Sequence, residues 1–485
     1  MFKLAAFIRS DGVSINPFAC KQLCYYIRNG VIISTQDMYE QTAGFDILKS
    51  TGVTVLKCVV IGDKNNSLEA GLNTDNVMFV DTISECIKYL SDKFNYNEWW
   101  FVGDNATANN LIWKGLIMDV HLSKSYANKY SHEWNNIEPH VLNQPEMLNK
   151  TLLDHPNMEF ELVSTTRIDL SMSKTIRHYM RRNTEESNLL MTMNQIITQG
   201  FKRPNRTGVN TRCLFGKLFE YNMIEKIDPD SGKSSFRLPL LTTKKMFTRG
   251  IFGELIWFLS GGTNSKDLEK NKINIWKGNT SREYLDSIGH PDYEEGECGP
   301  IYGFQWRHAG AKYIQGKHDY TGEGIDQVAQ VIESLQNDPY SRRHIINAWN
   351  VQDLSEMCLP PCHVLYQFMV HEEEGQKYLS LMMYQRSCDT FLGLPFNICS
   401  LGMFLTIMAH RVNMKPFKIV HSVADMHIYE NHIEAASKQI QREPCMFPYI
   451  SINCDPKDKL EDYTFDDIKI DDYYSHTPIK GTMVA

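Results

Sequence analysis

The sequence has 485 residues, enough for two or more domains and at least one large buried core. Apolar residues make up 42% of it and charged residues 22%, which excludes disordered, collagen-like and coiled-coil chains. The 50 basic and 58 acidic side chains give a net charge of −8, so the chain lacks the basic excess of a general nucleic-acid-binding protein. The 12 cysteines are scattered, and we find no leader pattern and no apolar run of about 18 residues. These features predict a soluble cytoplasmic protein with reduced thiols, no metal site and no membrane contact.

Residues 1–165 alternate short strand-like and helix-like patterns. Apolar residues recur every three or four positions from Ile83 to Phe94, which predicts a helix, and a second helix is expected at 106–114. Because strands and helices alternate, we expect an α/β domain with a largely parallel sheet. A cationic segment at 166–184 then predicts a solvated linker. The strands are expected at 3–8, 31–34, 53–61, 77–80, 98–102 and 118–122.

Residues 185–485 have longer patterns and form the second expected domain. Segments 250–260 and 396–412 are apolar nearly all round, which predicts two buried helices. Strand patterns occur at 344–349, 364–370 and 379–384, and a turn at 371–375 would join the last two into a hairpin. This mixture of strands and helices predicts a separate α+β domain.

Cys362 is the strongest candidate for a nucleophile, because Pro360 and Pro361 fix the backbone before it. A lone cysteine is usually a buried structural thiol, so its neighbours decide the interpretation. Arg386 and Ser387 end the strand that is expected to pair with the strand after Cys362, which would bring both close to the thiol. The other arginines of this set are Arg206, Arg342 and Arg343. In an acidic chain these arginines favour bidentate binding of a phosphate, and their charge would lower the pKa of the thiol.

Two polar residues stand out in the apolar helix patterns. Glu254 lies between aromatic and aliphatic residues, where an unpaired charge is costly. We therefore expect a buried, hydrogen-bonded acid with a perturbed pKa that moves protons. Asn397 carries both a donor and an acceptor, so it could read an edge that presents one of each, as an imide does.

Short segments of the second domain match one known family in order along the chain. Together they closely resemble thymidylate synthase, and the resemblance covers about three-fifths of the sequence. It implies the α+β fold of that family, with a large mixed sheet and buried helices. The segments are 206–208 (RTG), 236–244 (FRLPLLTTK), 254–258 (ELIWF), 299–308 (GPIYGFQWRH), 341–343 (SRR), 359–363 (LPPCH), 385–389 (QRSCD), 393–397 (GLPFN) and 425–429 (DMHIY).

The resemblance implies reductive methylation of dUMP to dTMP, with 5,10-methylenetetrahydrofolate as co-substrate and dihydrofolate as the second product. Cys362 would add to the uracil ring, and the rest of the implied catalytic set is Glu254, Tyr302, His363 and Asn397. The implied dUMP residues are Arg206, Arg342, Arg343, Arg386, Ser387, Asp389, Asn397, His427 and Tyr429, with Arg342 and Arg343 reaching over from the second subunit of a homodimer. The implied folate residues are Ile275, Trp276, Asn279, Asp389, Leu392, Gly393, Phe396 and Ala485. Family members commonly end in a Met-Ala-Val-like tail, and here the last two residues are interchanged.

The first domain resembles dihydrofolate reductase in its strand–helix order, its position before a synthase and its segments at 99–104 and 118–123. Its chemistry departs from that family. Gly103 is followed by Asp104 where the family has paired glycines, and Gln22 stands nearest to the family's active-site acid. With 14 basic and 20 acidic residues, 1–170 also carries a net charge of −6. We therefore expect a diverged reductase-like domain with weak or no activity, for which NADPH is a doubtful cofactor.

Three alternatives compete with this interpretation. The chain could be an active bifunctional dihydrofolate reductase–thymidylate synthase. It could be a pyrimidine hydroxymethylase acting on dCMP, but Asn397 argues against this because a cytosine amino group calls for an acceptor such as aspartate. The third alternative is a non-catalytic binding or scaffold protein. Cys362, Glu254, Tyr302 and the arginines argue against it for 185–485, whereas for 1–165 it is the interpretation we favour. The net charge gives RNA binding no support.

Overall fold

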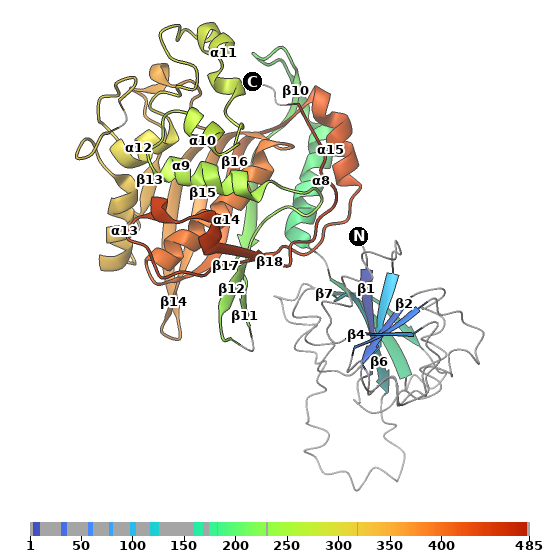
Figure 1. Ribbon diagram of the computed structural model, residues 1–485. Coiled ribbons are helices and arrows are strands. Elements are labelled where there is room, and N and C mark those ends of the chain that lie inside the picture. Colours follow the sequence, from blue (N-terminus) through green and yellow to red (C-terminus); the bar gives the residue numbers. More distant parts are fainter. Residues whose placement is uncertain are drawn as a thin grey trace, which may run out of the picture. The chain divides into compact units, whose positions relative to one another are not determined.

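The computed structural model describes residues 183–228, 231–317 and 319–482 and, before them, the backbone of eight strands between residues 3 and 181. The chain divides into two compact units, residues 1–182 and 183–485 (Figure 1). Each unit is described by itself below.

The first unit contains one eight-stranded sheet of strand order β4-β3-β2-β5-β1-β6-β8-β7. Strands β1 to β6 pair in parallel, whereas β8 pairs antiparallel with both β6 and β7. The largely parallel sheet expected from the sequence is therefore confirmed. Its strands are β1 (Lys3–Arg9), β2 (Val31–Thr35), β3 (Lys57–Ile61), β4 (Val77–Val80), β5 (Glu98–Val102), β6 (Ile117–Ser125), β7 (Phe160–Arg167) and β8 (Lys174–Arg181).

The segment expected to be a linker, 166–184, is different in the structure. Its residues 174–181 form β8, which is inserted between β6 and β7. The linker prediction gave most weight to the charges, whereas Thr175, Ile176 and Tyr179 are good strand formers that favour the observed strand. The helices expected at 83–94 and 106–114, and the positions of Gln22, Gly103 and Asp104, lie outside the described residues.

The second unit is built around a six-stranded mixed sheet of order β13-β14-β15-β16-β10-β9. All neighbouring strands pair antiparallel except β15 and β16, which are parallel. A smaller antiparallel sheet of order β11-β12-β17-β18 lies beside it. The strands are β9 (Phe201–Arg203), β10 (Thr211–Asn222), β11 (Glu225–Ile227), β12 (Ser234–Arg237), β13 (Ile345–Asn347), β14 (His363–Glu373), β15 (Gln376–Asp389), β16 (Lys415–Tyr429), β17 (Tyr449–Ile452) and β18 (Ile468–Asp471).

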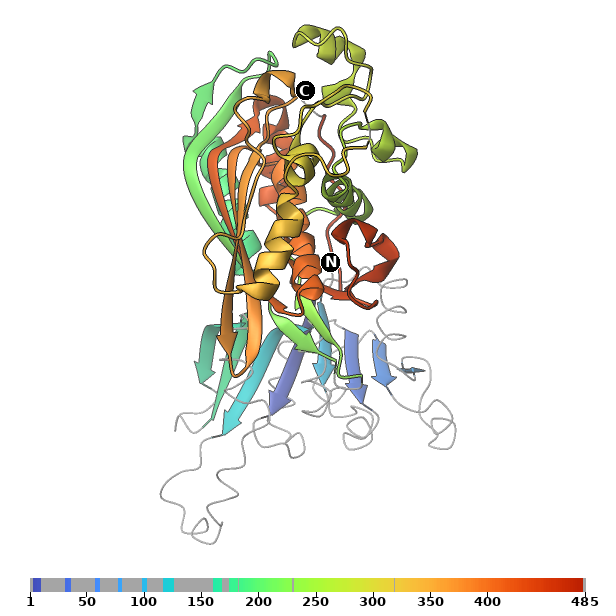
Figure 2. The same cartoon turned by 90° about the vertical axis from the view of Figure 1, so that its left-hand side faces the viewer.

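Helices cover one face of the large sheet (Figure 2). The two expected buried helices are confirmed as α9 (Thr248–Leu259) and α14 (Gly393–Arg411), although both begin slightly earlier than predicted. By length and composition α14 could cross a membrane, but 72% of its most apolar window is buried inside this unit, so it is a core helix. The other helices are α8 (Thr184–Gln199), α10 (Lys266–Lys270), α11 (Arg282–Ser287), α12 (Tyr302–His308), α13 (Gln327–Asn337) and α15 (Ile433–Ile440), with 3-10 turns at Gly278–Thr280, Leu354–Glu356, Glu430–His432, Leu460–Asp462 and Phe465–Asp467.

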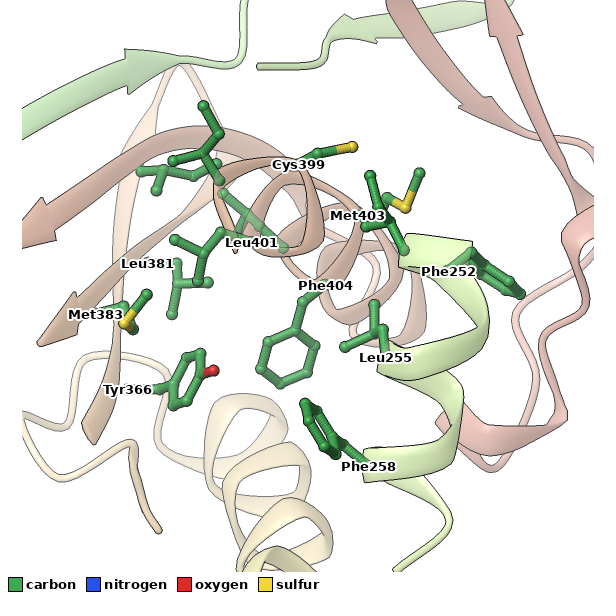
Figure 3. Close-up of a cluster of buried hydrophobic side chains, with 14 of the residues drawn as sticks. Phe252, Leu255, Phe258, Tyr366, Leu381, Met383, Cys399, Leu401, Met403 and Phe404 are labelled. Carbon is green, nitrogen blue, oxygen red and sulfur yellow. The ribbon is translucent and has the colours of Figure 1, made fainter. Parts of the chain in front are cut away.

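The strand register assigns each side chain of the large sheet to one of two faces. Tyr366 on β14 pairs with Met383 on β15, which pairs with His421 on β16, and all three are buried on the inner, helix-covered face. Figure 3 shows Tyr366 and Met383 beside Leu381, opposite Phe404 of α14 and Phe258 of α9. The alternate residues of the same strands lie on the outer face.

The predicted hairpin of β14 and β15 is confirmed, with longer strands and a shorter turn than expected. Glu373 pairs with Gln376, so the loop is only Glu374 and Gly375. Both loop residues have positive φ, 50° and 81°, which is the backbone of a type I′ turn and explains the glycine at the second position. This hairpin fixes which residues of β15 lie opposite Cys362.

Candidate active site

Cys362 lies immediately before β14, and Tyr302 holds its backbone in place. The Cys362 amide donates a hydrogen bond of 2.6 Å to the Tyr302 hydroxyl. Tyr302 begins α12, is almost fully buried, and stacks on Phe258 of α9 with ring centres 4.7 Å apart. The predicted nucleophile is therefore anchored to two core helices through one tyrosine.

Arg386 lies beside the Cys362 thiol, as the hairpin predicted. Its backbone amide donates to the Cys362 carbonyl at 2.9 Å, and its Nη2 is 3.9 Å from Sγ. The guanidinium also donates to the carbonyls of Pro361, at 2.8 Å, and Pro360, at 2.6 Å. The two prolines therefore supply acceptors that aim a cation at the thiol.

The expected lowering of the pKa of Cys362 is wrong in its net direction. The positive charges of Arg386 and Arg206 do lower this pKa, and the Tyr302 hydroxyl adds to that effect. Burial, however, is the largest cause, and it raises the pKa of the thiol above its ordinary value of 9.0. Sequence reasoning accounted for the charges but not for desolvation, which outweighs them here.

A β-bulge turns His363 toward the inner face. Leu365 pairs with Tyr384 on the outer face, but His363 pairs with Gln385, so Val364 is an extra residue in β14. The His363 ring centre then lies 5.5 Å from that of Tyr302. Burial lowers the pKa of His363 to about 4, against a smaller opposing effect of its hydrogen bond with Asn397, so the imidazole is neutral.

Glu254 is a half-buried, hydrogen-bonded acid with a perturbed pKa, at the position that the sequence indicated. The indole Nε1 of Trp276 donates to its Oε1 at 2.8 Å. Burial raises the pKa of Glu254 from its ordinary value of 4.5 to about 7, and the hydrogen bond from Trp276 only partly opposes this. Trp276 also lies edge-on to Tyr302, with ring centres 6.0 Å apart. An acid of this pKa can take up or release a proton near neutral pH.

We expect the Glu254→Gln variant to gain stability over the wild type as the pH rises from 5 to 8. In the wild type the folded pKa lies above the unfolded one, so the folded state binds more protons between these values and its stability falls as pH rises through them. Glutamine still accepts from Trp276 but never ionises. The difference in unfolding free energy should grow by roughly 2 to 3 kcal/mol over this range. Urea unfolding at both pH values measures it, and a difference that does not change with pH would contradict the assignment.

The ends of β15, β16 and β10 bring a second group of predicted residues together. Asp389 pairs with His427 in the register, and the His427 and Tyr429 ring centres are 5.3 Å apart. His427 Nδ1 lies 3.1 Å from Oδ1 of Asp425, which also pairs with Arg203. Because a carboxylate only accepts, Nδ1 carries the proton and Nε2 is left as an acceptor suited to a hydroxyl.

The predicted phosphate arginines occupy two places. Arg206 is exposed in the loop before β10, with its Nη2 3.3 Å from the Tyr284 hydroxyl, and its charge acts on both Cys362 and Tyr429. Arg342 and Arg343 are exposed just before β13, the edge strand of the large sheet. Of the four predicted phosphate arginines, Arg206 and Arg386 are the two whose charge acts on the Cys362 thiol within the described part of one chain.

The predicted folate residues lie around the start of α14 and the segment before α11. Asp389 Oδ1 accepts from the amides of Phe391 and Leu392, at 3.0 and 3.1 Å, which sets the entry into α14. Trp276 is buried, and the partly exposed members are Ile275, Asn279, Leu392, Gly393 and Phe396. The tail returns to this region, since His432 Nε2 lies 2.7 Å from the Thr482 carbonyl. Ala485 lies outside the described residues.

Sequence reasoning missed the polar residues behind the site. Gln385 and His421 are buried on the inner face and connect to Asn397, as described below. Asp425 holds His427, and Arg203 pairs with Asp425. Gln385 and Asp425 belong to the segments 385–389 and 425–429 that match the family. Each is a single polar residue in a strand pattern, and this could have marked it as a candidate site residue. His421 and Arg203 gave no signal, because a strand pattern does not reveal which polar side chains face each other.

A cysteine beside an arginine, with a half-buried acid and a neutral histidine near one tyrosine, defines an enzyme site for an anionic substrate. The thymidylate synthase family model matches residues 187–485. Thymidylate synthase of Saccharomyces cerevisiae is 45% identical over 310 residues, which cover 62% of this chain and 98% of the yeast protein. The chain belongs to the thymidylate synthase family, and this domain is a methyltransferase with methylenetetrahydrofolate as its co-substrate.

Two further relatives are bifunctional dihydrofolate reductase–thymidylate synthases. That of Paramecium tetraurelia is 40% identical over 348 residues, covering 70% of this chain and 71% of the relative. That of Leishmania amazonensis is 42% identical over 307 residues, covering 63% of this chain and 56% of the relative. The similarity to both is thus centred on the second unit.

Proposed function

We propose that residues 185–485 convert dUMP to dTMP with the reactive groups assembled around Cys362. The observation that carries this proposal is the Cys362 thiol 3.9 Å from the Arg386 guanidinium, on a backbone held by Tyr302. In this proposal the Cys362 thiol passes its proton to the network that includes Glu254, and the sulfur adds as a thiolate to C6 of the uracil ring. The electrons of the C5=C6 double bond move toward C5 and the C4 carbonyl oxygen, which makes C5 a carbon nucleophile. The folate supplies the one-carbon unit and the hydride when it is bound.

The remaining groups divide between binding and proton transfer. Arg206, Arg386 and the Ser387 hydroxyl would hold the phosphate, while His427 and Tyr429 would hold the ribose hydroxyl. His427 suits this task because Asp425 keeps its Nε2 as an acceptor. Glu254, whose pKa is about 7, would exchange protons through a network that includes Tyr302 and His363.

The residues proposed for the folate fit a flat aromatic ring system. Ile275, Leu392 and Phe396 are apolar side chains that stay partly exposed beside the start of α14. Burying them under a ligand would remove apolar surface from water, which favours binding. Gly481 packs so close to Phe391 and Leu392 that the tail already lies over this region. A tail in this place could close over a bound folate.

We also propose that the second unit forms a homodimer through the outer face of its large sheet. Met369, Met382 and Tyr384 on this face are 58%, 43% and 41% exposed, and Leu218 of β10 is 59% exposed. Met369 lies on β14 and Met382 and Tyr384 on the adjacent β15, while Leu218 lies on β10, beyond Ser422 of β16. These exposed apolar side chains occupy the face opposite the helix-covered one. Arg342 and Arg343 lie at the β13 edge of this sheet, where they could reach a partner's phosphate site. The assembled enzyme would be cytoplasmic.

Tritium release tests the proposed reaction directly. We expect the purified full-length protein to release tritium from 5-tritiated dUMP in the presence of methylenetetrahydrofolate, because hydrogen at C5 is lost as the carbon unit is added. dCMP tritiated at C5 should give little release, since Asn397 is not the acceptor that a cytosine amino group needs. Release from dCMP but not from dUMP would favour the hydroxymethylase alternative instead.

For the first unit we propose a diverged reductase-like domain without significant reductase activity. Two observations support the resemblance. The unit contains a largely parallel sheet, and the match to the Paramecium protein covers more of this chain than the second unit alone. The missing acid near Gln22 and the Asp104 beside Gly103 argue against the reaction and against NADPH binding.

We expect no measurable NADPH oxidation when the full-length protein is mixed with dihydrofolate at high enzyme concentration. The reaction needs a carboxylate to support protonation of the pterin, and glutamine cannot supply a proton in its place. NADPH oxidation followed by absorbance, with the thymidylate synthase reaction as a control for intact protein, measures this. A rate that disappears on mutation of Asp11 or Asp37 would show that a distant acid has taken over.

A further inference from the structure

Two buried side chains, His421 and Gln385, form a chain of hydrogen bonds that ends at Asn397, the predicted base-reading residue. His421 on β16 lies with its Nε2 2.8 Å from Oε1 of Gln385 on β15. Gln385 Nε2 donates at 3.1 Å to Oδ1 of Asn397, the fifth residue of α14. His421 is 0% and Gln385 2% exposed, so water does not compete for these bonds.

A backbone carbonyl fixes the direction of this chain. Gln385 Nε2 also donates to the carbonyl oxygen of Ser387 at 2.9 Å. A carbonyl only accepts, so the amino end of the Gln385 amide must face Ser387 and its oxygen must face His421. His421 must then donate through Nε2. The second hydrogen of the Gln385 amino group reaches Asn397, which therefore turns its oxygen inward.

The electrostatic surroundings of His421 keep it in the donating form. Burial, with a smaller contribution from His363, lowers the pKa of His421 to about 3, so the ring is neutral near pH 7. A neutral ring has one N–H, and Nδ1 has no hydrogen-bond partner among the described residues. His363 also contacts the Asn397 side chain through a hydrogen bond and is itself neutral. The single proton of His421 is thus held on Nε2 by its contact with Gln385.

We propose that His421 is a positioning residue for base choice. It holds the Gln385 oxygen while the Ser387 carbonyl holds the Gln385 amino group, and the two contacts together orient Gln385 and, through it, the amide of Asn397. With its oxygen held inward, Asn397 presents its amino group to the substrate. An amino group can donate to the carbonyl oxygen at C4 of uracil, whereas it meets another donor at C4 of cytosine. The inference rests on the proposed function, since it assumes that dUMP lies against Asn397.

The test compares nucleotide affinity in two variants of similar size. His421→Leu removes the donor, and Gln385 then loses the partner that holds its oxygen. We expect dUMP to bind about tenfold more weakly to this variant. The buried oxygen of Gln385 then has no donor, so Gln385 and the Asn397 amide bound to it are held less firmly in the orientation that suits uracil. The affinity for dCMP should stay equal or improve. His421→Gln keeps an N–H donor and should restore the wild-type ratio of dUMP to dCMP affinity to within about threefold.

Equilibrium dialysis of the full-length protein with each nucleotide gives these dissociation constants. The proposal is overturned if His421→Leu loses affinity equally for dUMP and dCMP, because the role of His421 is then purely structural. It is also overturned if His421→Gln loses as much affinity for dUMP as His421→Leu does. If His421→Leu does not fold by circular dichroism, Gln385→Met breaks the same chain and must reduce the ratio. Failure of the proposed function is a separate result, since the wild type would then neither release tritium from dUMP nor bind it.

Discussion

Replacing Cys362 with alanine is expected to lower the rate of dTMP formation by about four orders of magnitude or more, while dUMP binding stays detectable. The large effect follows because removing a nucleophile removes the covalent route itself. Binding should survive because the proposed phosphate groups, Arg206 and Arg386, do not depend on the sulfur. Arg386 keeps its bonds to Pro360 and Pro361 in the variant. Steady-state turnover and equilibrium dialysis with dUMP measure the two properties.

Cys358 offers a matched control for this experiment. It lies four positions earlier in the chain and is 2% exposed. Its backbone carbonyl accepts a hydrogen bond of 3.3 Å from the Tyr284 hydroxyl, and an alanine at this position keeps that carbonyl. Cys358→Ala should therefore keep most of the activity and lose only a little stability. A Cys362→Ala protein that still forms dTMP would remove Cys362 from the mechanism. Loss of dUMP binding in that variant would show that the thiol also shapes the phosphate site.

The sequence predicted the parts of the site that depend on local pattern and strand pairing. Cys362 and Arg386 were expected to meet because the two strand patterns lie on either side of a short turn, and the turn at Glu374 and Gly375 fixes their register. Glu254 was recognised because an acid in an apolar helix must be buried or paired. Both inferences use only the period of a strand or helix and the cost of burying charge.

Other features depend on tertiary contacts that no local pattern contains. The bulge at Val364 reverses the side on which His363 lies, and one extra residue in a strand leaves no mark in its composition. The net pKa of Cys362 is set by burial under neighbouring elements, which a list of nearby arginines does not include. The polar chain from His421 to Asn397 joins residues from two strands and a helix. Segment 174–181 was misassigned because charge was given more weight than strand propensity.

Mixing two inactive variants is expected to restore activity if the phosphate site is shared between subunits. Cys362→Ala is defective in its own site, whereas a chain carrying Arg342→Glu and Arg343→Glu would be defective in its partner's site. A heterodimer of the two then contains one site with its own Cys362 and with intact arginines from the other chain. Random exchange of equal amounts should give about a quarter of the wild-type activity, because half of the dimers are mixed and each has one intact site.

The control for this mixture pairs Cys362→Ala with Arg206→Glu. Arg206 acts on Cys362 within one chain, so each lesion disables its own subunit and no combination contains an intact site. We expect no recovery there, although the same exchange of subunits takes place. Analytical ultracentrifugation of each variant checks that dimers form, since Met369, Met382 and Tyr384 of the proposed interface are unchanged. An active monomer, or equal recovery in both mixtures, would contradict the shared site and leave Arg342 and Arg343 without a role in phosphate binding.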